Sequence, residues 1–396
     1  MTKSRILFVD DEERILSGLR RMLRPFHNQW DMSFVDSGAA ALEALDANGF
    51  DLVVSDMRMP GMDGIELLAE VREAHPEVVR IILSGYSDQV DTLRSTGVAH
   101  QYLAKPCDAE IIRNTVSKAS ALREELSDPD LLAVIAGTTR LPSAPTLYQE
   151  LSDELAGPDP SLPRVAKIVG RDPAMAAKIL QIVNSAFFGL RNNISDIGQA
   201  VSLLGIDTIM ALVLTTHVFR QPGLGGKQAA AVDGIWHKSL GVATMSEAIM
   251  RAEGGSSADT KTAFLAGLLH DCGKLVFASN RPDDFWRVDA EGGGREQEIA
   301  TFGADHAIVG AHLLAVWGLP DDIVEAVAYH HRPSVAVEAE LSALAAVHIA
   351  VALENRDDAS APLGLDRAYL AAAGLGDHEE QWLSVAWDLE YERENP

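Results

Sequence analysis

Residues 51–56 read DLVVSD, a short apolar run that ends in an aspartate. Four similar runs also lie within the first 104 residues. Those four are RILFV (5–9), DMSFV (31–35), RIILS (80–84) and HQYLA (100–104). The intervening segments, such as 12–23 and 64–74, show helical periodicity. Short apolar strands that alternate with amphipathic helices predict a doubly wound α/β domain, with five parallel strands covered by helices on both faces.

The polar residues at the ends of these runs predict a cation site and a nucleophile. Functional side chains gather where the strands of such a sheet end. Carboxylates brought together there would repel one another unless a hard cation such as Mg²⁺ neutralised them. Each residue alone could be an ordinary turn or helix cap, but the ordered set favours phosphoryl transfer to an aspartate. The set is Asp10, Asp11, Asp56, Ser84 and Lys105.

Four motifs in this order resemble the receiver domain of two-component response regulators over residues 3 to about 121. They are VDDE (9–12), DMRMPGMDG (56–64), LSG (83–85) and YLAKP (102–106). The resemblance implies a flavodoxin-like fold and a sensor histidine kinase as partner. It also implies that Asp56 is the phosphoacceptor, which would make the chain a phosphoprotein.

The same resemblance assigns roles around that aspartate. Asp11 and Asp56 would bind Mg²⁺, Asp10 would support the metal site, and the backbone carbonyl of Arg58 would be a further ligand. Ser84 and Tyr102 match the switch pair, and Lys105 matches the lysine that contacts the phosphoryl group. The 105–106 peptide bond is expected to be cis.

Residues 108–127 predict one helix, with Asp108 as its N-cap and an apolar stripe at 3.6-residue spacing. Two interpretations stay open for it. It is the last helix of the receiver domain, a connector or dimer helix that carries the phosphorylation signal onward, or both. We therefore place the receiver at 1–121 and an overlapping connector at 108–129.

From residue 130 to about 355 the sequence predicts an all-helical domain. Segment 172–183 begins with an Asp-Pro pair that is typical of a helix start. Several histidines and one aspartate lie near apolar helix faces. One such histidine is usually an ordinary core residue, whereas several on different helices favour a metal site. The candidates are His237, His270, Asp271, His306, His330 and His331.

This half resembles the HDOD domain, a helical output module related to HD-type phosphohydrolases, over about residues 131–335. The motifs are LPSAPTLYQEL (141–151), RDPAMAAKILQIVNSAFFG (171–189) and QAVSLLG (199–205). The six candidates match the metal ligands of the enzymatic relatives, which implies Fe, Mn or Zn as the metal. Two departures weaken the match: Val351 stands where a final Asp is expected, and HHRPSVAV (330–337) lacks the GYP signature. Hydrolysis of cyclic di-GMP is therefore not expected, and His348 could replace the missing Asp only if its helix turned favourably.

The stretch LLHDCGK (268–274) therefore has two interpretations. The His270-Asp271 pair is either a structural inheritance, with Lys274 a solvated cation, or a metal site in which Lys274 contacts phosphate. We expect an output through protein interactions. The alternatives are a metal-dependent phosphohydrolase and a nucleotide sensor that does not hydrolyse its ligand.

The composition narrows the partners and the location. Against 58 acidic residues the chain has 33 Lys and Arg, and this formal charge of −25 argues against DNA binding. Two cysteines, no long apolar span and no secretory leader predict a cytoplasmic protein without a membrane segment. A downstream protein partner and a homodimer are both compatible with the sequence. Residues 356–396 predict an acidic helical extension that packs on the helical domain or binds a partner.

Overall fold

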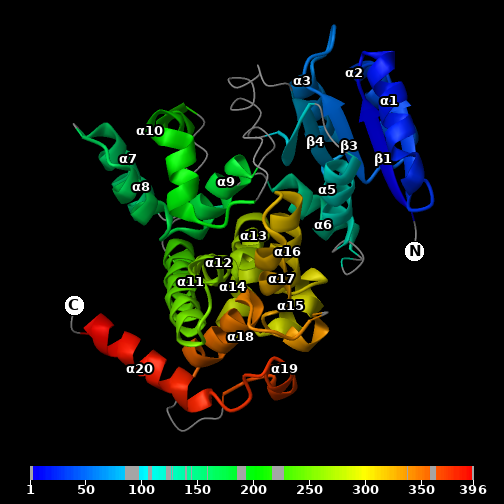
Figure 1. Ribbon diagram of the computed structural model, residues 1–396. Helices are drawn as coiled ribbons and strands as arrows, with labels where there is room; N and C mark the ends of the chain where they lie inside the picture. Colours follow the sequence, from blue (N-terminus) through cyan, green and yellow to red (C-terminus); the bar gives the residue numbers. More distant parts are fainter. Residues whose placement is uncertain are drawn as a thin grey trace. The chain divides into compact units, whose positions relative to one another are not determined.

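The computed structural model describes residues 3–84, 98–105, 109–121, 126, 128–138, 141–143, 145–157, 159–184, 193–215, 227–336, 338–356 and 363–394. The chain divides into two compact units, the first mainly of residues up to Arg140 and the second mainly of residues from Leu141 onward. Each unit is described separately below (Figure 1).

The first unit is built on a five-stranded parallel sheet in the order β2-β1-β3-β4-β5. This confirms the predicted α/β fold and all five predicted strands. The strands are β1 Ser4–Val9, β2 Trp30–Val35, β3 Leu52–Asp56, β4 Val79–Ser84 and β5 Gln101–Ala104. The helices are α1 Glu13–Leu23, α2 Gly38–Ala47, α3 Gly64–Ala74, α5 Ala109–Ala121 and α6 Pro129–Gly137, with a 3₁₀ turn, η1, at Arg24–Phe26.

Alternation along the strands explains why helices cover both faces of the sheet. Leu7 and Val9 of β1 point to one face, into a buried cluster with Leu45 of α2 and Leu67 of α3. Successive side chains of a strand point to opposite faces, and Phe8, which faces the other way, is also fully buried. Burial on both faces is what continuous apolar runs require.

The helix predicted at 108–127 is shorter in the structure. It appears as α5, while Leu126 and Asp128 are not helical. A new helix begins at Pro129, where the side chain of Asp128 accepts a hydrogen bond from the Asp130 amide. An acidic cap followed by proline in the first turn is a strong start for a separate helix.

A buried arginine ties α6 to the sheet. Arg80 of β4 is fully buried, and its guanidinium donates to the carbonyl oxygens of Val78, Val98 and Ala136 at 2.8–3.0 Å. His100 accepts the Arg80 backbone amide at Nδ1, so its Nε2 carries the proton and donates to Ala136 at 2.7 Å. Burial lowers the pKa of Arg80 to about 10. Because buried donors need partners, the Ala136 carbonyl near the end of α6 is a required acceptor for Arg80 and His100 of the first unit.

Every element described in the second unit is a helix, as predicted. The first helices are α7 Pro145–Ala156, α8 Leu162–Val169, α9 Pro173–Val183 and α10 Ile197–Thr215, the last kinked at Gly205. The central ones are α11 Lys227–Ala252, α12 Ser257–Leu269, α13 Cys272–Asn280, α14 Pro282–Ala290, α15 Arg295–Phe302, α16 His306–Val316 and α17 Asp321–Tyr329. The 3₁₀ turn η4 Pro333–Val335 and helices α18 Ala343–Glu354, α19 Arg367–Ala372 and α20 Glu379–Glu394 complete it.

Close packing of α11, α12, α17 and α18 forms the centre of this unit. Gly267 of α12 lies so near Ala243 of α11 that an added Cβ would come within 2.8 Å of the Ala243 Cα. The C-terminal extension packs on the same unit: Trp382 of α20 is 1% exposed and donates from Nε1 to Glu253 at 2.6 Å. Of the two predictions for residues 356–396, the structure therefore supports packing on the helical domain.

Candidate functional site

Three of the predicted receiver residues meet at the carboxyl ends of β1, β3 and β5. Asp10 follows β1 and is 1% exposed, Asp56 ends β3, and Lys105 follows β5. The Lys105 Nζ lies 2.6 Å from Oδ2 of Asp10 and 2.5 Å from Oδ1 of Asp56. One cation thus bridges the two carboxylates.

The other predicted residues of this site lie around that bridge. Asp11 is exposed beside Asp10, and the Arg58 amide donates to Oδ2 of Asp56 at 3.2 Å. Tyr102 of β5 is 4% exposed, so its ring is turned inward. Ser84 ends β4, but its side chain is outside the described part of the chain, as is Pro106 with its predicted cis bond.

Burial and pairing act in opposite directions on this bridge. Burial raises the pKa of Asp56, although the hydrogen bond and charge of Lys105 oppose it. Burial also works against the charge of Lys105, but its hydrogen bonds to Asp10 and Asp56 outweigh this and raise the lysine pKa. Positive charge at this site therefore favours the ionised form of Asp56.

A glycine after Asp56 is needed for the loop, a role that was not predicted. Gly64 opens α3 and donates its amide to the Met57 carbonyl at 2.9 Å. A Cβ on Gly64 would lie well inside van der Waals contact with the Asp56 carbonyl. The lack of space therefore explains why the last residue of DMRMPGMDG is glycine. Gly61 in the same motif has a φ of +84°, a conformation that favours glycine.

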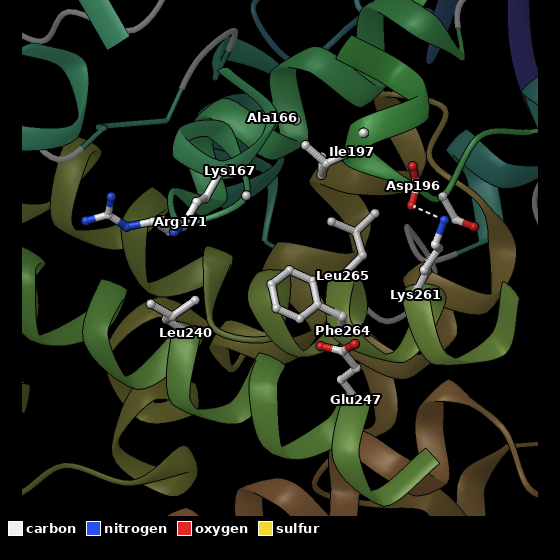
Figure 2. A pocket seen from close by; sticks show the side chains of 13 residues that line it. Ala166, Lys167, Arg171, Asp196, Ile197, Leu240, Glu247, Lys261, Phe264 and Leu265 are labelled. Carbon is white, nitrogen blue, oxygen red and sulfur yellow. Dashed lines mark ion pairs between the residues drawn. The ribbon is translucent and has the colours of Figure 1, made fainter. Parts of the chain in front are cut away.

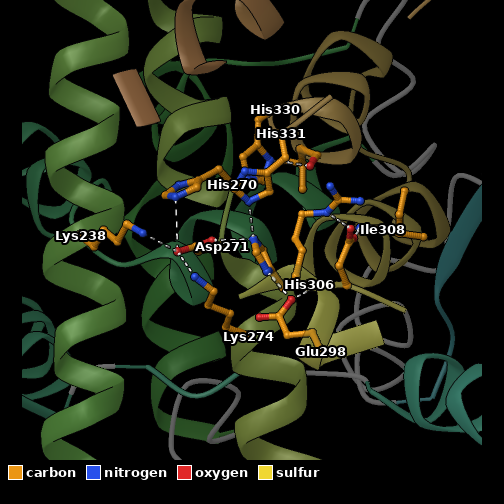
Figure 3. Close-up of polar contacts among 12 residues, drawn as sticks. Lys238, His270, Asp271, Lys274, Glu298, His306, Ile308, His330 and His331 are labelled. Atoms are coloured by element: carbon orange, nitrogen blue, oxygen red, sulfur yellow. Dashed lines mark hydrogen bonds and ion pairs between the residues drawn. The ribbon is translucent and has the colours of Figure 1, made fainter. Parts of the chain in front are cut away.

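In the second unit, two fully buried histidines, His270 and His330, lie in a cluster with Asp271 and His306 (Figure 3). The Nδ1 of His270 donates to the Gly267 carbonyl at 2.7 Å, and the Nδ1 of His330 donates to the Val327 carbonyl at 2.8 Å. The Nε2 of His330 is buried without a hydrogen-bond partner, whereas the Nε2 of His270 lies 3.4 Å from Oδ2 of Asp271. A histidine fixed at one nitrogen with the other left free is the usual arrangement of a metal ligand.

His306 and His331 complete the cluster. His306 starts α16, and its Nδ1 donates to Oε2 of Glu298 at 2.6 Å. Its Nε2 lies 3.1 Å from Oδ1 of Asp271 and 3.1 Å from Nε2 of His331. One donor atom from each of His306, His330 and His331 falls within 4.8 Å of the others. Glu298 was not predicted: an acid eight residues before a histidine, on a different helix, carries no local pattern.

Two lysines flank the aspartate of the cluster. The Nζ of Lys274 lies 2.8 Å from Oδ2 of Asp271, and that of Lys238 lies 3.8 Å from the same oxygen. Burial opposes ionisation of Asp271, but the charges of His270, Lys274 and His306 hold its pKa well below the ordinary value. Burial of the imidazoles lowers the pKa of His330 strongly and that of His331 to about 3, so both are neutral and able to bind a metal.

The structure does not bring His237 into this cluster. Its side chain is exposed on α11, and the residue of that helix that reaches Asp271 is Lys238, one position later. Successive residues of a helix point about 100° apart, so one position decides which side chain faces the site.

His348 does not take the place of the final Asp that is missing at Val351. Val351 is buried on α18, and His348 on the same helix is only 4% exposed. The Nδ1 of His348 lies 2.7 Å from the His330 carbonyl, and its Nε2 accepts the Asp366 amide at 2.8 Å. With both ring nitrogens engaged by backbone groups, His348 has no lone pair for a metal.

A crossing of two helices brings Asp271 and His306 together. Gly273 of α13 meets α16 so closely that an added Cβ would overlap the His306 carbonyl and lie 2.8 Å from the Gly310 amide nitrogen. The glycine of LLHDCGK thus lets the backbones touch. The resulting donor set of imidazole nitrogens and one carboxylate fits a transition metal such as Zn, Fe or Mn.

A cavity of about 330 Å³ lies elsewhere in the second unit, between α8, the start of α10, α11 and α12 (Figure 2). Phe264 and Leu265 form part of its wall, and Lys261 pairs with Asp196 at 2.8 Å across its edge. None of the predicted ligands lines it. Within the described residues no single helix is long and apolar enough to cross a membrane, while the bent pair α15 and α16 passes by length and composition alone.

Comparisons with known proteins match both units. Curated relatives include an uncharacterized protein of Treponema pallidum, 24% identical over 57% of this chain and 42% of its own length. The hydrogenase transcriptional regulatory protein HoxA of Cupriavidus necator is 35% identical over 38% of this chain and 30% of its own. The chain thus spans less than half the length of these two relatives.

Among solved structures, the MmoQ response regulator of Methylococcus capsulatus is 24% identical, with a TM-score of 0.47. The match covers 62% of this chain and 98% of that one. Family models match residues 6–117 as a response regulator receiver domain and residues 141–333 as an HDOD domain. The chain therefore belongs to the receiver family in its first unit and to the HDOD family in its second, the combination of a two-component response regulator.

Proposed function

We propose that Asp56 accepts a phosphoryl group from a sensor histidine kinase. Its carboxylate oxygen attacks the phosphorus, and the bond to the kinase histidine breaks as the new P–O bond forms. Asp10, Asp11 and Asp56, with the Arg58 carbonyl, hold Mg²⁺, which neutralises charge on the phosphoryl oxygens. The observation that carries the proposal is the bridge of Lys105 between Asp10 and Asp56, because it places a cation where those oxygens would lie.

Phosphorylation then acts on the HDOD domain. Ser84 is drawn inward to contact the phosphoryl group, beside the inward ring of Tyr102, and this movement changes the face of the receiver that leads toward α5. The output is a changed contact with a downstream protein or with a second copy of the chain. The HDOD match supports an output through protein interaction, and the high negative charge supports partners other than DNA.

The first experiment is phosphorylation by acetyl phosphate with Mg²⁺, followed by intact mass. We expect the wild type to gain one phosphoryl group and Asp56→Asn to gain none. Asp46→Asn is the matched control, because Asp46 is an exposed acid of α2 that pairs with His75. Equal phosphorylation of the Asp56→Asn chain would refute Asp56 as the acceptor.

A second candidate function rests on the convergence of His306, His330 and His331, one donor atom of each lying within 4.8 Å of the others. It also rests on the buried Nε2 of His330, which has no hydrogen-bond partner. Leaving a buried polar atom without a partner costs about 1–3 kcal/mol, so a purely structural role does not account for the Nε2 of His330. We propose that His270, Asp271, His306, His330 and His331 hold a transition metal. A bound metal would supply hydroxide for attack on a phosphoester, and Lys238 and Lys274 would attract the negative charge of that substrate.

Metal content per chain tests this candidate in excess Mg²⁺, which keeps the receiver site out of the count. We expect about one transition metal in the wild type and little in Asp271→Ala. His75→Ala, in the receiver unit, is the control and should retain the metal. Turnover of a phosphodiester that disappears in Asp271→Ala would favour hydrolysis, whereas saturable nucleotide binding without product would favour a sensor. No transition metal in the wild type would refute this candidate and leave the phosphoacceptor proposal intact.

A further inference from the structure

The segment that carries two of the candidate ligands, His330 to Ser334, is held from outside at both of its ends. At the first end, His348 donates from Nδ1 to the His330 carbonyl at 2.7 Å. An amide can only donate, so the 2.8 Å contact with the Asp366 amide shows that Nε2 of His348 is unprotonated. Two backbone groups thus select a single neutral form of this buried histidine.

At the other end, Asp366 holds Ser334. The Ser334 hydroxyl donates to Oδ2 of Asp366 at 2.5 Å, and the Tyr369 amide donates to Oδ1 at 3.1 Å. Asp366 therefore caps α19 and contacts the ligand-bearing segment with its side chain, while its amide reaches His348. A single residue connects to both ends of the segment.

Asp366 lies outside the region that matches the HDOD family, which ends at residue 333. We propose that residues 363–372 act as a strap that holds His330 and His331 in metal-binding position through Asp366 and His348. Both are positioning residues, because neither offers a free atom to a metal. The inference rests on the proposed metal site and adds that its affinity depends on the C-terminal segment.

The physical reason is the position of His330 at the end of α17. The last carbonyls of a helix have no partner within the helix, and His348 supplies one for His330. Without that donor the last turn would loosen, and the ring would lose the fixed direction of its free Nε2. Residues that orient metal ligands typically change affinity by about 10–100-fold when they are removed.

Titration of the full-length chain with Co²⁺ in excess Mg²⁺ tests the strap through the visible absorption of the bound ion. We expect His348→Leu to weaken Co²⁺ binding by about 10–100-fold. His348→Gln should bind nearly as the wild type does, since a Gln amide can donate to His330 and accept from Asp366. Asp366→Ala, which keeps the backbone amide but frees Ser334, should show an intermediate loss. His378→Leu is the matched control, because His378 lies in the C-terminal segment and its ring bonds to Glu253.

Circular dichroism would show whether each variant folds, and Asp366→Ala carries the test if His348→Leu does not. If His348→Leu and Asp366→Ala both bind Co²⁺ with the affinity of the wild type, the strap is overturned, while the metal site itself is still supported. Equal losses in His378→Leu would show a general effect of the C-terminal segment and would also overturn it. Failure of the wild-type chain to bind Co²⁺ would refute both the metal site and the strap.

Discussion

At the scale of single residues, the histidines of the cluster differ because their surroundings differ. His306 lies between two carboxylates. Burial and the charge of Lys274 oppose its protonation, but Asp271 and Glu298 outweigh them and raise its pKa. His331 has no such carboxylate partner at hydrogen-bonding distance among the described contacts, and burial lowers its pKa to about 3. Without a metal, His306 therefore holds a proton more readily than His331 does.

This difference predicts how the metal-free protein responds to acid. His331 is neutral when folded but takes up a proton near its ordinary pKa of 6.5 when unfolded. Its stabilising contribution is therefore present above pH 6.5 and declines as the pH falls toward 3. In protein from which a chelator has removed the metal, we expect this residue to lower the free energy of unfolding by about 2 kcal/mol between pH 8 and pH 5. Urea unfolding at the two pH values should show a smaller loss in His331→Asn; an identical loss would contradict the assignment.

Gly64 gives a second prediction for a single residue. Gly64→Ala should strain the loop after Asp56, lower stability by about 1–3 kcal/mol and slow phosphorylation by acetyl phosphate. Gly18→Ala is the control, because nothing lies within 4 Å of the corresponding Cβ on α1. If Gly64→Ala is phosphorylated at the wild-type rate, the close approach to the Asp56 carbonyl has no bearing on the acceptor.

At the scale of elements, the crossing of α13 and α16 holds the candidate metal site together. The chain brings His306 to Asp271 through contact of two backbones at Gly273 and Gly310 rather than through side-chain packing. Backbone contact leaves little room for adjustment, so the two ligands keep a fixed separation. The crossing thus requires a residue without a side chain at position 273, between Asp271 and Lys274.

Gly273→Ala should therefore force the two helices apart. We expect a loss of about 1–3 kcal/mol of unfolding free energy and weaker metal binding. Gly234→Ala is the matched control: this glycine lies within α11, nothing is within 4 Å of its Cβ, and alanine there should stabilise by up to about 1 kcal/mol. Thermal unfolding and Co²⁺ titration measure both effects. Wild-type behaviour of Gly273→Ala would mean that the crossing tolerates a side chain.

The two units differ in how much of each candidate site could be predicted from the sequence. The strand ends of the first unit were predictable because each functional residue directly follows its apolar run, and parallel strands bring such ends together. In the second unit the ligands come from separate helices. Lys238 rather than His237 faces Asp271 because of the rotation of a 26-residue helix, which depends on its packing against α12 and α18. Glu298 and His348 likewise act across the fold, with no local pattern to reveal them.

At the scale of the whole molecule, the chain carries two candidate cation sites of opposite chemistry. The receiver site offers carboxylates and a carbonyl, which suit Mg²⁺, while the helical site is dominated by imidazole nitrogens, which suit transition metals. The imidazole-rich site therefore disfavours Mg²⁺, and excess Mg²⁺ competes with a transition metal for the receiver site. The two can be loaded and tested independently in one protein.

Beryllofluoride, a mimic of the phosphoryl group, tests communication across the whole chain. In the presence of Mg²⁺ we expect it to change either self-association or hydrogen exchange in the helices of the second unit. Asp56→Asn treated in the same way is the control and should not respond. If neither property changes in the wild type, the HDOD domain is not controlled through Asp56.

The anchoring of α6 by Arg80 has a consequence for modularity. A receiver fragment that stopped at residue 121 would lack the Ala136 carbonyl and leave a fully buried guanidinium and an imidazole short of an acceptor. Such a fragment would expose this arginine to water or partly unfold around it. The natural point of exchange for swapping this receiver onto another output thus lies after Gly137, with α6 retained as part of the donated piece.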